Sequence, residues 1–231
     1  FGGQRFRNSG STAFGTLDMH RALVVSSDTY FYSLGPEIGV NNLHDFMKPF
    51  GFGQLTGIDI EGERRGVLPS TDWKRAAYKN RDQQRWYAGE TISITVGQGY
   101  NSFTLMQLAQ ATAVLANDGV YMKPHLVRTI KNPRTDEQIQ TVVEATHKIA
   151  LKKENLQVIK RALAEVTVSG TAAGAFVGAP YTTAGKTGTA HVYSLRGAKY
   201  QSSAIDERLR DHSLFMAFAP VNQPKIAIAV I

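Results

Sequence analysis

The chain has 231 residues, of which 42% are apolar and 19% charged, the balance of a globular protein with a sizeable core. It has no cysteine, which excludes disulfides, a thiol nucleophile and thiolate metal ligands. The net charge is +7, but the lysines and arginines are scattered and never alternate with aromatic residues as in a groove for single-stranded nucleic acid. The composition therefore favours a solvated basic surface over a nucleic-acid binder.

The first part of the chain is expected to be helical. Residues 1–15 are rich in glycine, arginine and serine and predict a loop. Apolar residues at helical spacing then predict helices at about 16–25, 28–39 and 41–50. Residues 54–92 carry many turn signals, so we expect mostly loop with short elements there.

The second part is expected to form one more pair of helices and a sheet. Ser102 is predicted to cap a helix of about 103–117, and a second amphipathic helix is predicted at about 155–168. Short strands and a hairpin are expected in residues 120–150. Three further strands, with a polar loop at 194–212 between the first two, are predicted at about 181–193, 213–219 and 225–231. A helical part followed by a mainly antiparallel sheet is an α+β fold.

The most informative motif lies in the strand predicted at 181–193. It reads Gly185-Lys186-Thr187-Gly188-Thr189-Ala190. Gly188 has no side chain and lets another backbone approach, while an ammonium and two hydroxyls suit a small anionic substrate. Two other interpretations are a chance turn and the end of a phosphate-binding P-loop. The P-loop needs glycine at position 180, where this chain has Pro180, which lacks an amide donor.

A second motif, Ser26-Ser27-Asp28, stands between two predicted helices. Serine and aspartate at such a place are typical of helix N-caps, so a purely structural role is one interpretation. The other is catalytic, because a Ser-x-Asn-like triplet followed by Lys-Thr-Gly is the order found in penicillin-binding proteins and class A β-lactamases. The two motifs are 186 − 26 = 160 residues apart, which suits two elements of one domain.

With these motifs and several others, the chain resembles the transpeptidase domain of class B penicillin-binding proteins, most closely the elongation-type branch. The resemblance covers nearly the whole chain and includes, besides Lys186-Thr187-Gly188, the segments Val25–Tyr32, Phe50–Gly53, Thr56–Asp59, Gly97–Tyr100, Ala116–Val120, Arg208–His212 and Phe215–Pro220. It implies one transpeptidase domain over residues 1–231, with helices packed on a central antiparallel sheet and incomplete at both ends. It also implies D,D-transpeptidase activity, in which a serine acyl-enzyme cross-links peptidoglycan stem peptides.

The resemblance assigns roles to individual residues. Ser26 is the motif serine that passes a proton to the leaving nitrogen. Lys186 supplies positive charge for the substrate's terminal carboxylate, and the hydroxyls of Thr187 and Thr189 are donors to the same group. The backbone N–H of Thr189 provides half of an oxyanion hole. Gly188 allows the substrate to lie antiparallel to the strand.

Two departures from the family pattern stand out. The third residue of the middle motif is Asp28 instead of asparagine, and it is expected to orient Ser26 or to contact a stem-peptide amide. The nucleophile motif Ser-x-x-Lys is absent, since no serine of the chain has a lysine three residues later. We therefore expect the attacking serine and its lysine to lie upstream of Phe1, so that this piece alone forms no penicillin adduct.

The resemblance also implies the partners and the location. The expected partners are stem peptides ending in D-Ala-D-Ala, β-lactam antibiotics and proteins of the cell-wall elongation complex. The expected location is the periplasmic side of the bacterial inner membrane, with contact to the membrane only through an upstream anchor. No cofactor is expected, and no metal either, because the six histidines are isolated from one another.

Two alternatives to a transpeptidase stay open. One is a serine β-lactamase or a β-lactam sensor on the same fold, and the other is a non-catalytic scaffold of the elongation complex.

Overall fold

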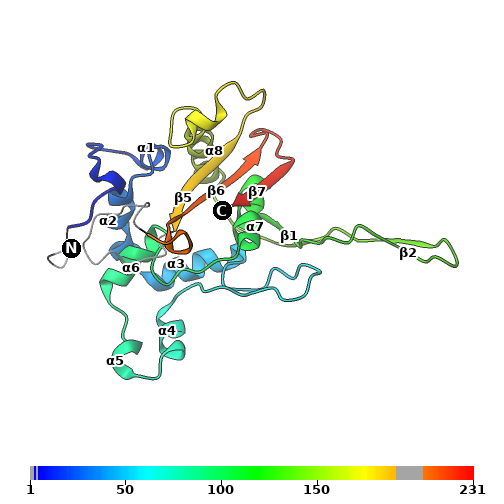
Figure 1. Cartoon of the computed structure of the whole chain (residues 1–231), viewed down its shortest axis with the longest axis horizontal. Helices are drawn as coiled ribbons and strands as arrows, with labels where there is room; N and C mark the ends of the chain where they lie inside the picture. Colours follow the sequence, from blue (N-terminus) through cyan, green and yellow to red (C-terminus); the bar gives the residue numbers. More distant parts are fainter. Residues whose placement is uncertain (1–2, 4, 191–204) are drawn as a thin grey trace.

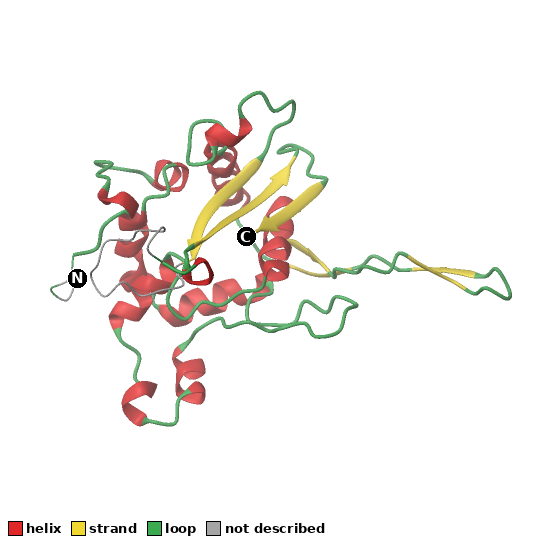
Figure 2. Ribbon diagram, viewed as in Figure 1, coloured by secondary structure: helices red, strands yellow, loops and turns green. Residues whose placement is uncertain are grey.

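The computed structural model describes residues 3, 5–190 and 205–231. The helices of these residues are α1 (Met19–Val24), α2 (Asp28–Ile38), α3 (Val40–Met47), α4 (Thr71–Ala77), α5 (Arg81–Gln84), α6 (Ala88–Thr95), α7 (Leu105–Ala116) and α8 (Lys153–Val166). The strands are β1 (Val120–Met122), β2 (Thr129–Lys131), β3 (Gln138–Gln140), β4 (Ala145–Lys148), β5 (Ala184–Ala190), β6 (His212–Ala219) and β7 (Ile226–Val230). The α+β architecture expected from the sequence is confirmed (Figure 2).

The central sheet has three antiparallel strands in the order β5-β6-β7 (Figure 1). Lys186 stands opposite Met216, which in turn stands opposite Ala229. Side chains alternate between the faces of a strand, so Lys186 and Gly188 share one face of β5 while Thr187 and Thr189 share the other. Among the described strands β5 is an outer strand, and its second edge is not paired with another strand. The polar loop predicted at 194–212 falls largely on residues 191–204, which lie outside the described residues.

Helices α7 and α8 cover one face of this sheet. A buried cluster joins Ala116 of α7 and Leu163 of α8 to Ala184 of β5 and Phe218 of β6. Phe218 is 1% exposed, and burying a side chain of this size contributes about 2–3 kcal/mol. The cluster fixes the position of β5 and therefore of the Lys-Thr-Gly motif.

The cap of α7 differs from the prediction. Thr104, not Ser102, is the N-cap residue, and its hydroxyl accepts from the backbone N–H of Gln107 at 3.1 Å. The Gln107 side chain accepts from the Thr104 N–H in return, which completes a capping box. Ser102 instead pairs with Val67 through two backbone hydrogen bonds. The Thr-x-x-Gln spacing was the signal for the true helix start.

Residues 54–92 are mostly loop with short elements, as the sequence predicts. Three short helices, α4, α5 and α6, lie in or overlap this stretch, and α6 continues past it to Thr95. Local caps explain the first two, because the side chains of Ser70 and Asn80 accept backbone N–H groups of α4 and α5. No helix of the part of the chain described here is both long and apolar enough to cross a bilayer.

A buried lysine connects α4 to α6. Lys74 is 2% exposed, forms an ion pair with Glu90 and donates to the backbone oxygen of Arg85 at 2.7 Å. Its ammonium lies 5.2–5.6 Å from the ring centres of Trp86, Tyr87 and Tyr100. Such cation–π contacts stabilise a desolvated cation. The contacts hold α6 in place, and the end of α6 lies at the cavity described below.

The strands predicted in residues 120–150 form two separate ribbons. β1 pairs with β4 close to the body of the protein, and β2 pairs with β3 in an arm that projects far from it (Figure 1). The arm is fixed at its base by Asp59, whose carboxylate accepts from the backbone N–H groups of Leu126 and Val127 at 2.6 and 2.9 Å. These two hydrogen bonds lower the pKa of Asp59.

Candidate active site

Ser26 occupies the tight turn between α1 and α2. Its backbone φ is +57°, a left-handed value that non-glycine residues rarely adopt. The turn is held by backbone bonds from Ser26 N–H to Leu23 O at 3.3 Å and from Ser27 N–H to Ala22 O at 2.8 Å. A left-handed serine costs about 1–3 kcal/mol, and strain of this kind concentrates at functional sites. The turn orients the Ser26 hydroxyl toward β5.

Lys186 brings an ammonium group to that hydroxyl. Its Nζ donates to Ser26 Oγ at 2.7 Å, across 160 residues of sequence, and to Thr187 O at 2.9 Å. Burial lowers the pKa of Lys186 below its ordinary value of 10.5, and the negative charge of Asp28 opposes part of that shift. The two motifs identified in the sequence therefore meet side chain to side chain.

Asn8, a residue that no sequence motif singled out, holds the middle motif in place. Its Oδ1 accepts from Thr29 N–H at 2.9 Å, from Thr29 Oγ1 at 3.1 Å and from Ser27 Oγ at 3.3 Å. Asn8 and Ser27 are both buried. Ser27 is the N-cap residue of α2 by position, but its hydroxyl makes no capping bond. Ser27 therefore stands at the N-cap position of α2, as the helix-cap interpretation of this motif predicts. Its side chain, however, does not cap the helix.

Asp28 begins α2 and faces the same region. Its Oδ2 accepts from the backbone N–H of Ser9 at 3.2 Å, and among the described residues no hydrogen bond joins it to Ser26. The expectation that Asp28 orients Ser26 directly finds no contact to support it. In this position the carboxylate ties the segment before α1 to the start of α2.

The hydroxyl of Thr187 has a partner that the sequence did not suggest. Thr171 Oγ1 lies 2.7 Å from Thr187 Oγ1, so one hydroxyl donates to the other. The next residues along β5, Gly188 and Thr189, are exposed. A Cβ placed on Gly188 would meet only Leu214, at an ordinary 3.5 Å. Packing therefore does not require glycine at this position. Gly188 is one of the residues that line the cavity described next.

These residues surround one cavity of about 570 Å³, which is large enough for a small peptide end or a bicyclic ligand. Ser26 and Asp28 line it, as do all four residues from Lys186 to Thr189. The last residue of α6, Thr95, also lines the cavity, together with Val96 and Gln98 just after the helix. Within the described residues no three histidine, aspartate or glutamate side chains are grouped closely enough to hold a metal ion. The cavity offers a cation, hydroxyl donors and a strand edge that no described strand pairs, a set that suits an extended peptide with a terminal carboxylate.

Comparison with known proteins agrees with this geometry. The family profile described as "Penicillin binding protein transpeptidase domain" matches residues 2–231. The chain belongs to the penicillin-binding protein transpeptidase family. The class and fold expected from the sequence motifs are thereby confirmed.

Relatives of this transpeptidase domain include proteins named peptidoglycan D,D-transpeptidase MrdA. The one from Acinetobacter baumannii is 39% identical over 98% of this chain, and the one from Escherichia coli is 36% identical over 99% of it. The alignments cover 33% and 36% of those two proteins, so the chain spans about a third of the length of the curated relatives it matches.

Solved structures show the same fold. Pseudomonas aeruginosa PBP2 in complex with WCK 5153 superposes with a TM-score of 0.81 at 37% identity, covering 98% of this chain and 47% of that one. PBP2 from Helicobacter pylori in a complex with MreC gives 0.79 at 29% identity, covering 99% of this chain and 38% of that one. Both are PBP2 structures, as the resemblance to the elongation-type branch predicts.

Proposed function

We propose that this transpeptidase domain supplies the Ser26–Lys186 part of the active site of a serine D,D-transpeptidase that cross-links peptidoglycan stem peptides. The observation that carries the proposal is the 2.7 Å contact from Lys186 Nζ to Ser26 Oγ at the wall of a cavity. The name of the MrdA relatives, peptidoglycan D,D-transpeptidase, supports the substrate class.

The nucleophile in this proposal is a serine on a segment outside the present sequence, because no serine here belongs to a Ser-x-x-Lys motif. The lysine of that motif takes the proton of this serine's hydroxyl, and the serine oxygen attacks the carbonyl carbon of the penultimate D-alanine and forms an ester. As the C–N bond breaks, the Ser26 hydroxyl gives its proton to the leaving nitrogen of the terminal D-alanine. Lys186, already donating to Ser26 Oγ, replaces that proton. The amine of a second stem then attacks the ester and frees the serine.

Substrate binding in this proposal uses the rest of β5. The charge of Lys186 and the hydroxyls of Thr187 and Thr189 receive the terminal carboxylate. The Thr189 N–H is one donor of the oxyanion hole, a type of contact whose loss costs about 10²–10³ in rate. Gly188 leaves room for the substrate to run along the unpaired edge of β5, in the manner of an added strand.

The proposal extends to the partners and the place of action, and the relatives support it. The family description, penicillin binding protein, supports the part of the proposal that the protein binds β-lactams. The MreC complex of the Helicobacter PBP2 supports the part that it assembles with cell-wall elongation proteins. A substrate of this kind puts the site on the periplasmic side of the inner membrane.

The test is covalent labelling of the full-length protein with fluorescent penicillin, read on a denaturing gel. Lys186→Ala should slow acylation at least tenfold, because it removes a charged contact of the reacting site. Lys79→Ala is the matched control, since Lys79 is exposed and lies outside the cavity. An unchanged rate in Lys186→Ala would refute the proposal. The 231-residue chain alone should form no adduct, and a covalent band on it would contradict the external nucleophile.

The same gel separates the alternatives. A penicillin adduct that hydrolyses within seconds would identify a serine β-lactamase, and one that persists fits a transpeptidase or a sensor. Absence of any adduct on the full-length protein would favour the non-catalytic scaffold.

A further inference from the structure

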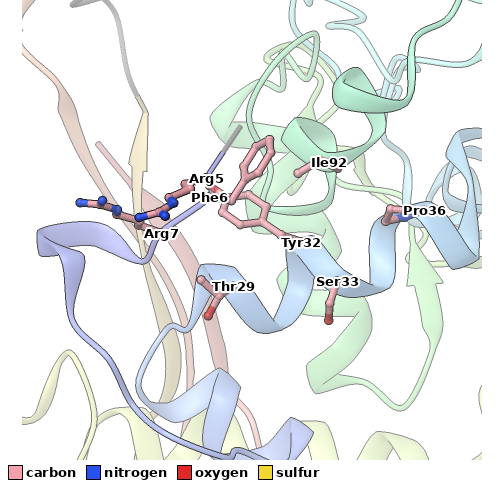
Figure 3. Close-up of a pocket in the computed structure, with 8 residues that line it drawn as sticks. All are labelled: Arg5, Phe6, Arg7, Thr29, Tyr32, Ser33, Pro36 and Ile92. Atoms are coloured by element: carbon pink, nitrogen blue, oxygen red, sulfur yellow. The ribbon is translucent and has the colours of Figure 1, made fainter. Parts of the chain in front are cut away.

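A second groove runs along α2, next to the cavity that holds Ser26. It has a volume of about 510 Å³. One wall is a single face of α2, formed by Thr29, Tyr32, Ser33 and Pro36 at positions i, i+3, i+4 and i+7. The opposite wall is the segment from Arg5 to Arg7, and Ile92 of α6 lines the groove between them (Figure 3).

The segment that forms the second wall is firmly attached to α2. Phe6 packs against Tyr32 with ring centres 5.2 Å apart (Figure 3). Directly after it, Asn8 accepts three hydrogen bonds from Ser27 and Thr29, and the Ser9 N–H donates to Asp28. In an extended segment alternate side chains point the same way, so Arg5 and Arg7 project together, on the side away from Phe6. Figure 3 shows both guanidinium groups on one side of the Phe6 ring.

Both arginines are exposed and available to a ligand. Like most of the described arginines they form no ion pair, and among the described residues no carboxylate lies within 4.0 Å of either guanidinium. A guanidinium fork matches the two oxygens of a carboxylate.

The remaining lining fits a peptide. Tyr32 presents a phenol whose pKa is raised by burial and, to a lesser extent, by the charge of Asp28, so it stays a hydrogen-bond donor at neutral pH. The hydroxyls of Thr29 and Ser33 lie on the same wall, and the rings of Phe6 and Pro36 with Ile92 are apolar. An apolar surface with a few polar groups and a cationic rim suits a short acidic peptide better than a bare inorganic anion.

We propose that this groove is a second substrate site, which binds a carboxylate-bearing stretch of a peptide through Arg5 and Arg7. The inference rests on the proposed function for the nature of the peptide: a cross-linking enzyme needs a second stem beside the first. The two sites share a wall, because Asn8 lines the Ser26 cavity and hydrogen-bonds to Thr29 of the groove. A peptide held in the groove would therefore have a direct approach to the acyl-enzyme.

The test measures binding of a fluorescein-labelled tripeptide, L-Ala-γ-D-Glu-meso-diaminopimelate, to the full-length protein by fluorescence anisotropy. This probe has no D-Ala-D-Ala bond, so it cannot acylate the enzyme. Arg5→Gln/Arg7→Gln should raise its Kd at least tenfold, because two charge-assisted contacts are lost. The control Arg64→Gln/Arg65→Gln removes the same charge from two exposed arginines outside the groove and should change the Kd less than twofold.

Two further measurements identify the chemistry that is recognised. Arg5→Lys/Arg7→Lys keeps the charge but loses the fork, so its Kd should lie between those of the wild type and the glutamine variant. A tripeptide with its side-chain carboxylates amidated should bind the wild type as weakly as the acidic peptide binds the glutamine variant.

Three results would overturn the proposal. The first is equal Kd values for the two glutamine variants, and the second is equal affinity for the acidic and the amidated peptides. The third is displacement of the probe by inorganic phosphate at lower concentrations than by acetate, which would make the groove a phosphate site. Binding is read without any acylation, so a failure here is separable from a failure of the Lys186 labelling test.

Discussion

The left-handed backbone of Ser26 can be tested by comparing two substitutions that both remove its hydroxyl. Ser26→Ala keeps a Cβ at φ +57°, whereas Ser26→Gly relieves it. A left-handed residue with a Cβ costs about 1–2 kcal/mol more than glycine. Against this, glycine loses more conformational entropy than alanine when the chain folds, which costs about 0.5–1 kcal/mol. The mid-values of the two ranges, about 1.5 and about 0.75 kcal/mol, leave Ser26→Gly more stable than Ser26→Ala by about 0.75 kcal/mol.

Both variants lose the hydrogen bond from Lys186 to the Ser26 hydroxyl, so its loss does not contribute to the difference in their stability. For a domain of this size, 1 kcal/mol corresponds to about 2–4 °C in melting temperature. Thermal unfolding followed by circular dichroism should therefore place Ser26→Gly about 1–4 °C above Ser26→Ala. Penicillin acylation should fall to the same level in both variants, since both lack the relay hydroxyl.

An alanine variant that melts at or above the glycine variant would refute the reasoning. It would mean that the turn after α1 relaxes without cost and that Ser26 is not held under strain.

The remaining predictions concern β5. Gly185→Ala should destabilise the fold by about 1–3 kcal/mol, because its Cβ would lie 2.5 Å from the Phe215 ring. Gly188→Ala should leave the melting temperature nearly unchanged but slow acylation, and equal melting losses in both glycine variants would contradict this. The lowered pKa of Lys186 places the alkaline loss of acylation below pH 10.5. Lys186→Arg keeps the charge but cannot give up a proton, so it should acylate slowly at every pH and show no such alkaline loss in a pH–rate profile.

The pKa of Lys186 also sets the sign of a stability effect. Burial makes the folded-state pKa lower than the unfolded-state value, so the charged lysine is penalised in the folded protein. The penalty is complete below the folded-state pKa. It is relieved as the pH rises from that value toward the unfolded-state value.

The motifs that carry charge and hydroxyl groups in a fixed order could be predicted from the sequence alone. Ser26 and Lys186 were matched as a pair, and the structure places them in contact. Their catalytic roles stay predictions until the labelling experiment is done. The strand around Lys186 could also be predicted, because its threonines and the following apolar strands have an unambiguous pattern.

Contacts that depend on tertiary structure could not be predicted in this way. Asn8 lies in a segment whose composition predicts only loop, yet it receives three hydrogen bonds from the start of α2. Thr171 is remote in sequence from the strand hydroxyl that it contacts. The Arg5–Arg7 groove exists only because Asn8 and Phe6 attach the preceding chain to α2.

Local signals were misjudged where two residues competed for one role. Ser102 and Thr104 are both good capping residues, and the glutamine three positions after Thr104 decided between them. The short elements expected in residues 54–92 are helices, and they are held by tertiary contacts such as Lys74 with Glu90. Short helices of this kind depend on packing more than on intrinsic propensity.

The projecting β2–β3 arm has a practical use. Its tip, residues 132–137, lies far from both the Ser26 cavity and the groove along α2 (Figure 1). Exposed hairpin tips accept inserted sequence readily, and the Asp59 clamp holds the base of the arm independently of the tip. An affinity tag or a fluorophore inserted there would label the protein while leaving the Ser26 cavity and the groove along α2 untouched.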